Sequence, residues 1–294
     1  MSFEGNEPFA TILGIGGYGI TTLQRCGGVV EGQWPRPFME DWRMKIIISP
    51  AKKMNIQNDL FEARGLPRFV EEAAYLQTVL RAKNISELQA LWQCNDKLTA
   101  LNQRRLKEDV YRATTPAILA YEGLQYQHMA PEVLSREGLD YIEAHLRILS
   151  GFYGVLRPFD AVVPYRLEMQ AKLAVDGAKN LYAYWGGKPY DALKEAGGVI
   201  VNLASQEYAK AVTPYLGAGD RFVTCRFGEI LNGTFKQKGT FAKMARGEMV
   251  RYMAEHHIEC LKDLQDFDAL GMTYAPEWSD ANTMSFIVES TKEE

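Results

Sequence analysis

Short apolar runs alternate with segments of helical period along most of this chain, and that alternation constrains the fold more than any other feature. Ile46 to Ile48 and Val199 to Leu203 are short runs rich in strand-forming residues, and a helical stripe of apolar residues occupies Arg68 to Lys83 between them. A second long helix is predicted from Thr240 to His257. Interleaved strands and helices of this kind are typical of α/β proteins.

A hairpin signal near the carboxyl end indicates that the sheet is not purely parallel. Arg221 to Ile230 is predicted to be a strand, and Asn232-Gly233 then form a two-residue turn into a strand over Thr234 to Lys236. Asn-Gly is favoured there because both central residues of a type I′ turn need positive φ angles. Since no repeat, low-complexity tract or linker divides residues 44–289, we predict one compact domain of mixed α/β (α+β) class with a mixed sheet.

The remaining elements follow from capping residues and apolar spacing. A capping box of Asn84 and Glu87 opens a helix that continues to Gln93, and Asn95 or Asp96 caps the next helix. Leu98 and Leu101 are expected to line one side of that next helix. A helical face of Leu139, Ile142, Leu146 and Leu149 is predicted to end at Ser150-Gly151, and a further helix is predicted over Gln206–Val212. Strands are predicted over Ala117–Tyr121, as a buried strand, and over Ser285–Val288, as the last strand.

Residues 1–43 differ from the rest of the chain, and we expect them to be an extraneous extension ahead of a natural start at Met44, or else a real appendage. Gly14, Gly16 and Gly19 spell G-x-G-x-x-G, but a dinucleotide fold needs a full helix after that turn and an acidic residue about 20 positions further on. The helix expected from Ile20 to Cys26 is too short, and the stretch lacks the continuous apolar run of a signal peptide. Residues 290–294 are expected to be a polar tail.

Composition excludes several function classes. The net charge of −4 and a pI near 5.7 argue against a strongly basic nucleic-acid coat, although a local basic face is compatible with them. No apolar run is long enough to span a membrane. The four cysteines form no C-x-x-C pair and the four histidines have no ligand spacing, so we expect a cytoplasmic protein with no metal site and no cofactor.

Three polar segments stand where strands are expected to end or turn, which is where α/β proteins bind ligands. Ser49 to Lys53 follows the first strand, and its hydroxyl and ammonium groups suit an anion. Asn202 to Tyr208 follows the central strand, where Ser205 either caps a helix or helps present backbone N–H groups to an anion. Ser150 to Met169 places two arginines among aromatic residues. They either clamp a phosphate or pair structurally with Asp160 and Glu168.

A fourth segment, Arg221 to Arg251, holds seven Lys and Arg residues against two Glu residues, a local charge of +5. Lys243 and Arg246 are three positions apart and therefore neighbours on one helix face. Such a face either binds phosphates in a salt-dependent way or is simply solvated. No recognisable nucleophile and base pair, P-loop or paired-carboxylate frame occurs.

Six motifs together resemble the YaaA family of bacterial peroxide stress proteins. They are ISPAK at Ile48–Lys52, LSGFYGVLRPFD at Leu149–Asp160, PYRLEM at Pro164–Met169, LYAYWG at Leu181–Gly186, VNLASQEY at Val201–Tyr208 and KMARG at Lys243–Gly247. The resemblance covers residues 44–289 and implies a single domain of unusual topology with a positively charged cleft. It also implies a protein that limits damage when hydrogen peroxide meets intracellular iron, and that binds duplex or distorted DNA.

The resemblance also implies site residues. Those expected to line the cleft are Ser49, Lys52, Arg157, Tyr165, Arg166, Ser205, Glu207, Lys243 and Arg246. A helix-hairpin-helix-like element is implied over Ile85–Leu106, with contacts from Asn95, Lys97, Arg104 and Arg105. The hairpin there contains no glycine, although such elements normally use glycine to offer backbone N–H groups to phosphate.

Two functions therefore stay open from the sequence. The first is a DNA-binding stress protein whose cleft holds phosphate and an unstacked base. The second is an enzyme of unknown reaction that acts on a nucleotide or nucleobase-containing small molecule. Direct iron sequestration is disfavoured because no cluster of ligands is visible in the sequence.

Overall fold

The computed structural model describes residues 21–25, 28–32, 44–194 and 198–288. The three glycines of the G-x-G-x-x-G pattern and the polar tail at 290–294 lie outside these residues. The helix expected from Ile20 to Cys26 is wrong, because Thr21–Arg25 form strand β1, which pairs antiparallel with β2 (Gly28–Gly32). A dinucleotide-binding turn would need a helix in that position.

The central sheet of the described chain has eight strands: β3 (Lys45–Ile48), β7 (Leu146–Ser150), β8 (Gly154–Leu156), β10 (Val199–Asn202), β11 (Arg221–Leu231), β12 (Thr234–Lys236), β13 (Met272–Tyr274) and β14 (Thr283–Val288). Their order is β13-β14-β11-β10-β3-β7-β8, with β12 beside β11. β14, β11, β10, β3 and β7 are parallel, whereas β13, β12 and β8 are antiparallel to their neighbours. The mixed α/β class and mixed sheet are confirmed.

The strand order reverses between β3 and β10. From β3 the chain first builds β7 and β8 on one side, and then returns to add β10, β11 and β14 on the other side. The loops that leave the carboxyl ends of β3 and β10 therefore diverge and open a crevice between them. In open α/β sheets this reversal is where ligands bind.

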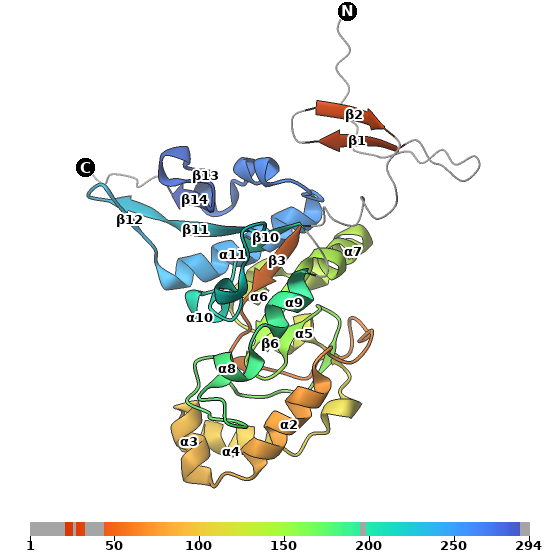
Figure 1. Cartoon of the computed structure of the whole chain (residues 1–294), viewed down its shortest axis with the longest axis vertical. Helices are drawn as coiled ribbons and strands as arrows, with labels where there is room; N and C mark the ends of the chain where they lie inside the picture. Colours follow the sequence, from red (N-terminus) through yellow and green to blue (C-terminus); the bar gives the residue numbers. More distant parts are fainter. Residues whose placement is uncertain (1–20, 26–27, 33–43, 195–197, 289–294) are drawn as a thin grey trace, which may run out of the picture.

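Helices surround the sheet: α2 (Val70–Arg81), α3 (Ile85–Trp92), α4 (Asp96–Arg105), α5 (Ala117–Ala120), α6 (Leu124–Met129), α7 (Arg136–His145), α8 (Leu181–Trp185), α9 (Lys188–Lys194), α10 (Gln206–Ala209) and α11 (Gly239–Glu255). α11 packs against β11, α6 and α7, and α9 packs against β8. Figure 1 shows α2, α3 and α4 together at the end of the molecule away from β11, β13 and β14.

Short elements complete the described chain. β4 (Lys53–Met54) pairs with β6 (Tyr121–Glu122), and β5 (Thr115–Pro116) pairs with β9 (Ala161–Val162), both antiparallel. Single turns of 3₁₀ helix occur at Val110–Arg112, Pro131–Val133, Thr213–Tyr215, Ala269–Gly271 and Pro276–Trp278, with a longer one at Leu261–Asp266. The β4–β6 ladder brings the chain after β3 next to the segment that leads into α6.

Elements with strong local signals form where they are predicted. Ile46, Ile47 and Ile48 are fully buried in β3. The capping box opens α3, since Glu87 N donates to Asn84 Oδ1 and Asn84 N donates to Glu87 Oε2. The Asn232-Gly233 turn joins β11 to β12 with φ angles of 51° and 69°. The capping box and the hairpin turn depend on local geometry alone, whereas β3 also pairs with β7 and β10.

Two further expectations about secondary structure are wrong, and so is one about burial. The buried run Ala117–Ala120 is a turn of helix rather than a strand, because a short apolar run has no period that separates the two. The helix predicted through Leu149 ends at His145, and Leu146 starts strand β7, whose backbone bonds to β3. Leu98 is 39% exposed, because α4 buries Thr99 and Asn102 instead.

Candidate functional site

A cavity of about 380 Å³ lies at the carboxyl ends of β3 and β10, where the strand order reverses. We call it the switch-point cavity. It is lined by Ser49, Pro50, Ala51, Lys52, Lys53, Glu122, Gly123, Leu124, Gln125, Tyr126, Tyr165, Arg166, Leu167, Glu168, Ser205, Glu207, Tyr208, Lys243 and Arg246. The structure thus brings together eight of the nine residues expected to line a cleft, and it places Arg157 elsewhere.

Two serines join the diverging loops at the floor of the cavity. Ser205 N donates to Ser49 Oγ over 2.8 Å, and Ser49 Oγ donates to Ser205 Oγ over 3.2 Å. Tyr126 Oη donates to the Ser49 carbonyl, which ties α6 to the same loop. Ser205 makes no side-chain capping bond to α10, so its hydroxyl faces the opposite loop rather than the helix.

One wall of the cavity is an ion-pair cluster. Glu168 Oε1 lies 2.9 Å from Arg166 Nη2 and 3.2 Å from Lys52 Nζ. These contacts are charge pairs whose geometry is not that of hydrogen bonds, since Glu168 Oε1 and Arg166 Nε have no hydrogen-bond partner in the described chain. Of the two interpretations for Arg166, structural pairing with Glu168 is therefore the one observed.

Helix α11 contributes two cations to the lining, and neither has an acceptor among the residues that the structure describes. Lys243 is exposed, and Arg246 lies one turn further along the helix. Arg246 Nε is buried without a hydrogen-bond partner, and no carboxylate of the described residues pairs with this guanidinium. Burial lowers the pKa of Arg246, and it raises the pKa of the neighbouring Cys225 thiol to about 12. A buried cation left in this state costs free energy unless an anion meets it.

Glu207 adds a second carboxylate to the cavity. Its Oε1 accepts a hydrogen bond from Gln170 N over 3.2 Å. Burial raises the pKa of Glu207, and the negative charge of Glu168 raises it further. Glu168 and Glu207, two of the three carboxylates that line the cavity, therefore stand in different environments. Glu168 is paired with two cations and the pKa of Glu207 is raised, which is the pattern that separates an acid from a base.

The hydroxyl of Tyr165 forms hydrogen bonds within the core of the protein. It lies 2.6 Å from Ser150 Oγ and 2.8 Å from Tyr121 Oη, and all three residues are buried. Burial raises the pKa of Tyr165 to about 12, so it stays protonated at neutral pH. Tyr165 lines the switch-point cavity, but its polar end points into the core.

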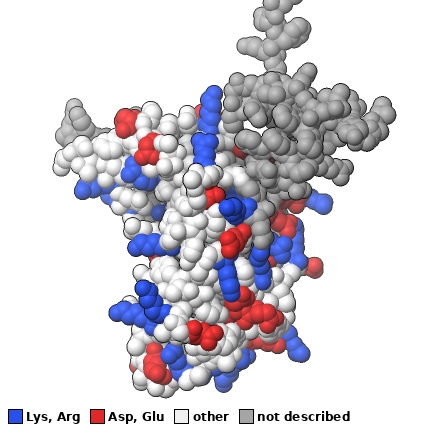
Figure 2. Space-filling model, in the orientation of Figure 1, with Lys and Arg blue, Asp and Glu red and all other residues white. Residues whose placement is uncertain are grey.

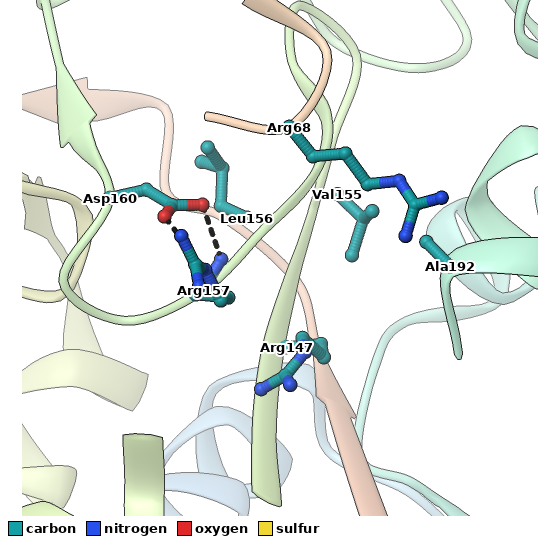
Figure 3. A pocket seen from close by; sticks show the side chains of 7 residues that line it. All are labelled: Arg68, Arg147, Val155, Leu156, Arg157, Asp160 and Ala192. Atoms are coloured by element: carbon teal, nitrogen blue, oxygen red, sulfur yellow. Dashed lines mark hydrogen bonds and ion pairs between the residues drawn. The ribbon is translucent and has the colours of Figure 1, made fainter. Parts of the chain in front are cut away.

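Arg157 lies in a second cavity, of about 440 Å³, which we call the arginine cavity (Figure 3). It is lined by Arg68, Arg147, Val155, Leu156, Arg157, Asp160 and Ala192. β8 runs antiparallel to β7 and carries the chain back toward the amino ends of the parallel strands. A motif that begins at the carboxyl end of β7 therefore delivers Arg157 to the opposite end of the sheet.

Of the four implied helix-hairpin-helix contacts, two side chains form hydrogen bonds within the protein and two are exposed. Asn95 caps α4 by accepting from Leu98 N, and Arg105 Nη2 donates to the Met54 carbonyl over 2.6 Å. Lys97 and Arg104 are exposed. Gln93, in the left-handed conformation, ends α3 where a glycine would be usual.

Gln125 and Glu122 are cavity residues that sequence reasoning missed, whereas Lys53 belongs to the predicted segment Ser49 to Lys53. Gln125 is 6% exposed, and its Nε2 has no partner among the described residues. It stands on the short helix α6, whose sequence carries no signal for a site. Lys53 and Glu122 reach the cavity through the β4–β6 ladder, where they form an ion pair, and that pairing joins segments far apart in the chain.

In the part of the chain that the structure describes, no group of three or more His, Cys, Asp or Glu residues is placed to hold a metal ion. No helix among the described residues is both long and apolar enough to cross a membrane.

A family model described as "Peroxide stress protein YaaA" matches residues 44–278. This chain belongs to the YaaA family. Relatives of similar length carry the name "UPF0246 protein": one from Pediococcus pentosaceus is 51% identical over 83% of this chain and 98% of its own length. Another, from Lactiplantibacillus plantarum, is 49% identical over 84% of this chain and its whole length. The YaaA match spans both cavities, and the family is one of peroxide stress proteins.

Proposed function

We propose that this YaaA protein acts in peroxide stress by binding DNA, with phosphates held at the switch-point cavity and one unstacked nucleotide inside it. The observation that carries the proposal is Arg246, a partly buried cation with no acceptor among the described residues. Lys243, on the same face of α11, lines the same cavity. A phosphate beside these two side chains would supply the missing acceptors through charge-assisted bonds.

The dimensions of the site support an extruded nucleotide rather than an intact duplex. A volume of about 380 Å³ lies in the range of small-molecule sites, roughly 300–1,000 Å³. On the face shown in Figure 2, Lys and Arg residues alternate with Asp and Glu residues and form no continuous basic patch. Proteins that take a base out of the stack bind most readily where pairing is already disturbed.

Protection against iron and peroxide follows from the same binding in this proposal. Occupied DNA would be shielded where peroxide and iron react, and the protein itself would not need to hold iron. A cytoplasmic location, where bacterial DNA lies, is part of the proposal.

Fluorescence anisotropy with a duplex that contains an unpaired bubble and with its fully paired counterpart tests the proposal. We expect the bubble to bind about tenfold more tightly, because its bases are already unstacked. The double variant Lys243→Ala with Arg246→Ala should weaken bubble binding by tenfold or more. It should also reduce the slope of log affinity against log salt by about 2, since each phosphate contact contributes roughly 0.9.

The matched control is Arg136→Ala with Lys262→Ala, which removes the same charge from exposed positions outside both cavities. It should change the affinity less than twofold. Equal losses in the two double variants, or no binding of either DNA at low salt, would refute DNA binding at this cavity.

A second function is favoured by one specific observation, the two carboxylates of unlike environment. Phosphate binding alone does not need Glu207, whose pKa is raised by burial and by Glu168. A carboxyl with a raised pKa beside one that is paired with two cations suits proton transfer to or from a bound nucleotide. The alternative proposal is an enzyme that acts on a nucleotide or nucleobase-containing small molecule, with Ser49 and Ser205 positioning it.

This alternative is tested by incubating the protein with a panel of nucleosides and nucleotides and separating the products by chromatography. We expect turnover of one substrate class, with a loss of about 10²-fold or more in Glu207→Gln. Product formation at the same rate in the wild type and in Glu207→Gln would eliminate Glu207 as a catalytic residue. No turnover of any compound in the panel would leave DNA binding as the function.

A further inference from the structure

We propose that Gln125 is a ligand-binding residue of the switch-point cavity, whose side-chain amide turns to donate a hydrogen bond to the same phosphate oxyanion as Arg246. The proposal rests on the proposed function, because that function places a phosphate beside Arg246. It adds a neutral donor from a second helix, so that the site recognises the arrangement of the phosphate oxygens as well as their charge.

Buried polar atoms without hydrogen-bond partners are concentrated at this cavity. Six side-chain atoms of the described residues are in this state: Trp92 Nε1, Gln125 Nε2, Arg166 Nε, Glu168 Oε1, Glu229 Oε1 and Arg246 Nε. Four of the six belong to residues that line the switch-point cavity. Arg166 and Glu168 are paired with each other by charge, which leaves Gln125 and Arg246 uncompensated among the described residues. A ligand with acceptor oxygens would remove the cost of burying these donors.

Two helices bring Gln125 and Arg246 together. Gln125 follows Leu124 at the start of α6, and Arg246 precedes Gly247 in α11. A Cβ atom on Gly247 would lie 2.1 Å from the Gln125 carbonyl oxygen and 2.9 Å from His128 Cβ, so the two backbones meet without a side chain between them. Residues 125 and 246 thus stand at this contact, and both line the same cavity.

Other contacts hold the backbone of α6 in place. Tyr126 Oη donates to the Ser49 carbonyl over 3.0 Å, which ties the helix to the loop after β3. His128 Nδ1 lies 2.7 Å from Glu248 Oε1, which ties it to α11. Adjustment of Gln125 to a ligand therefore falls to its side chain rather than to its backbone.

The amide of Gln125 can turn without a loss of hydrogen bonds. Gln125 is 6% exposed, its side chain forms no hydrogen bond with the described residues, and of its two polar atoms only Nε2 is fully buried. The torsion about the last bond of a glutamine side chain is broad and roughly two-fold. A half-turn puts Nε2 in the place of Oε1, the more exposed atom, and presents N–H donors to the cavity.

A phosphate suits both groups better than the edge of a base does. Phosphate oxygens accept hydrogen bonds from the guanidinium of Arg246 and from a neutral amide. A base N–H would bind Gln125 through Oε1 and leave Nε2 buried without an acceptor. The half-turn buries Oε1 instead, and an unpaired buried carbonyl oxygen is tolerated more often than an unpaired N–H. The unpaired donor therefore favours the phosphate.

Isothermal titration of the full chain with inorganic phosphate, in chloride buffer, tests the proposal without DNA. Gln125→Met has nearly the same shape and no amide, and should bind phosphate about tenfold more weakly, the effect of losing one charge-assisted hydrogen bond. Without phosphate its Tm should equal or exceed that of the wild type, because an unpaired buried donor is removed. Gln127→Met, at an exposed position of α6 outside the cavity, is the matched control and should change the affinity less than twofold.

Gln125→Glu is a second variant, which preserves the shape of the side chain if Gln125→Met does not fold. It places a carboxylate beside Arg246 and compensates that cation from within the protein. Phosphate binding should weaken roughly a hundredfold or more, and Tm without phosphate should rise. Wild-type affinity in Gln125→Glu would overturn the proposal.

The salt dependence of binding to bubble DNA separates a neutral donor from a displaced cation. Gln125→Met should bind the bubble about tenfold more weakly, with an unchanged slope of log affinity against log salt. A substitution that merely displaced Arg246 would reduce the slope by about 0.9, the value for one lost phosphate contact. A slope reduced by that amount would assign Gln125 a structural role and overturn the proposal.

Failure of this proposal and failure of the proposed function give different results. Phosphate binding that weakens in Gln125→Met, without binding of either DNA, would uphold the role of Gln125 and refute DNA binding. DNA binding that weakens in Arg246→Ala but not in Gln125→Met would do the reverse. Weaker binding of DNA but not of phosphate in Gln125→Met would place a base against Gln125 and overturn the proposal, as would no heat of binding with phosphate up to about 10 mM.

Discussion

The two cavities stand at opposite ends of the same parallel strands and both are lined by arginines, but they differ in the other groups of their lining. The switch-point cavity holds five cationic side chains against three carboxylates, and the arginine cavity holds three against one. Serine hydroxyls and two unlike carboxylates accompany the cations only at the switch point. Chemistry on a bound anion would need such groups, so we propose it only for the switch-point cavity.

Helices α11 and α6 pack closely at the wall of the switch-point cavity, so a larger side chain at their contact should lower the stability of the protein. A Cβ atom added to Gly247 would lie 2.1 Å from the Gln125 carbonyl, where α11 meets α6. Gly247→Ala should therefore destabilise the protein by about 3 kcal/mol and lower Tm by roughly 6–12 °C, as measured by thermal unfolding. Gly239→Ala, at an open position of the same helix, should change Tm by less than about 2 °C. Similar Tm values for both variants would show that the helices do not meet tightly at the cavity.

Substitution of Tyr165 tests whether its hydroxyl stabilises the fold or contributes to ligand binding at the switch-point cavity. Tyr165→Phe removes the hydroxyl that joins Ser150 to Tyr121, which should cost about 2 kcal/mol and lower Tm by roughly 4–8 °C. DNA affinity, measured by anisotropy at a temperature where the variant is folded, should change less than twofold. A variant with an unchanged Tm and a large loss of affinity would place the hydroxyl in the binding site instead.

The raised pKa of Glu207 makes the stability of the protein depend on pH through the switch-point cavity. Because the pKa of Glu207 is raised in the folded state, the folded protein keeps its proton at pH values where the unfolded chain has lost it. Stability from this group therefore falls as pH rises from the ordinary glutamate range through the raised pKa. Glu207→Gln should raise Tm at pH 7.5 by about 2 °C or less, since solvent screens a partly exposed group, and the gain should vanish near pH 4. Glu277→Gln, at an exposed position, should show no gain at either pH, and a gain equal to that of Glu207→Gln would remove the assigned cause.

The smallest effect is expected at the α3–α4 hairpin. Lys97 and Arg104 are exposed, so Lys97→Ala with Arg104→Ala should leave Tm within about 1 °C. If the hairpin contacts phosphates in addition to the cavity, the salt slope of DNA binding should fall by up to roughly 2. An unchanged slope would confine DNA contacts to the switch-point cavity.

Particular residues show how far the sequence could be used to predict this structure. The Asn84 capping box, the Asn232-Gly233 hairpin and the buried strand at Ile46–Ile48 form as predicted. The helix predicted through Leu149 fails at Leu146, where pairing with Ile46 turns the same apolar spacing into a strand. A helical stripe and a buried strand both use leucine and isoleucine at short intervals, and the partner strand decides between them.

The candidate site was predictable where it followed strand ends and unpredictable where it required pairing. Ser49 and Ser205 stand 156 positions apart and share a hydrogen bond because β3 and β10 are neighbours. Arg157 belongs to the same group of sequence motifs, but the β7–β8 hairpin takes it to the other end of the sheet. Arg147 and Gln125 carried no signal, because nothing adjacent to them in sequence distinguishes a cavity wall from a solvated face.

The sequence by itself determined the α/β class, the mixed sheet, the caps and the motifs of the YaaA family, because these depend on residues close together in the chain. Only the tertiary structure decided at which end of the sheet each motif stands and which cation meets a carboxylate. Arg166 pairs with Glu168, whereas Arg246 has no partner among the described residues, although both are arginines in motif segments. The difference arises from strand order and helix packing, which bring distant residues together and which no local spacing contains.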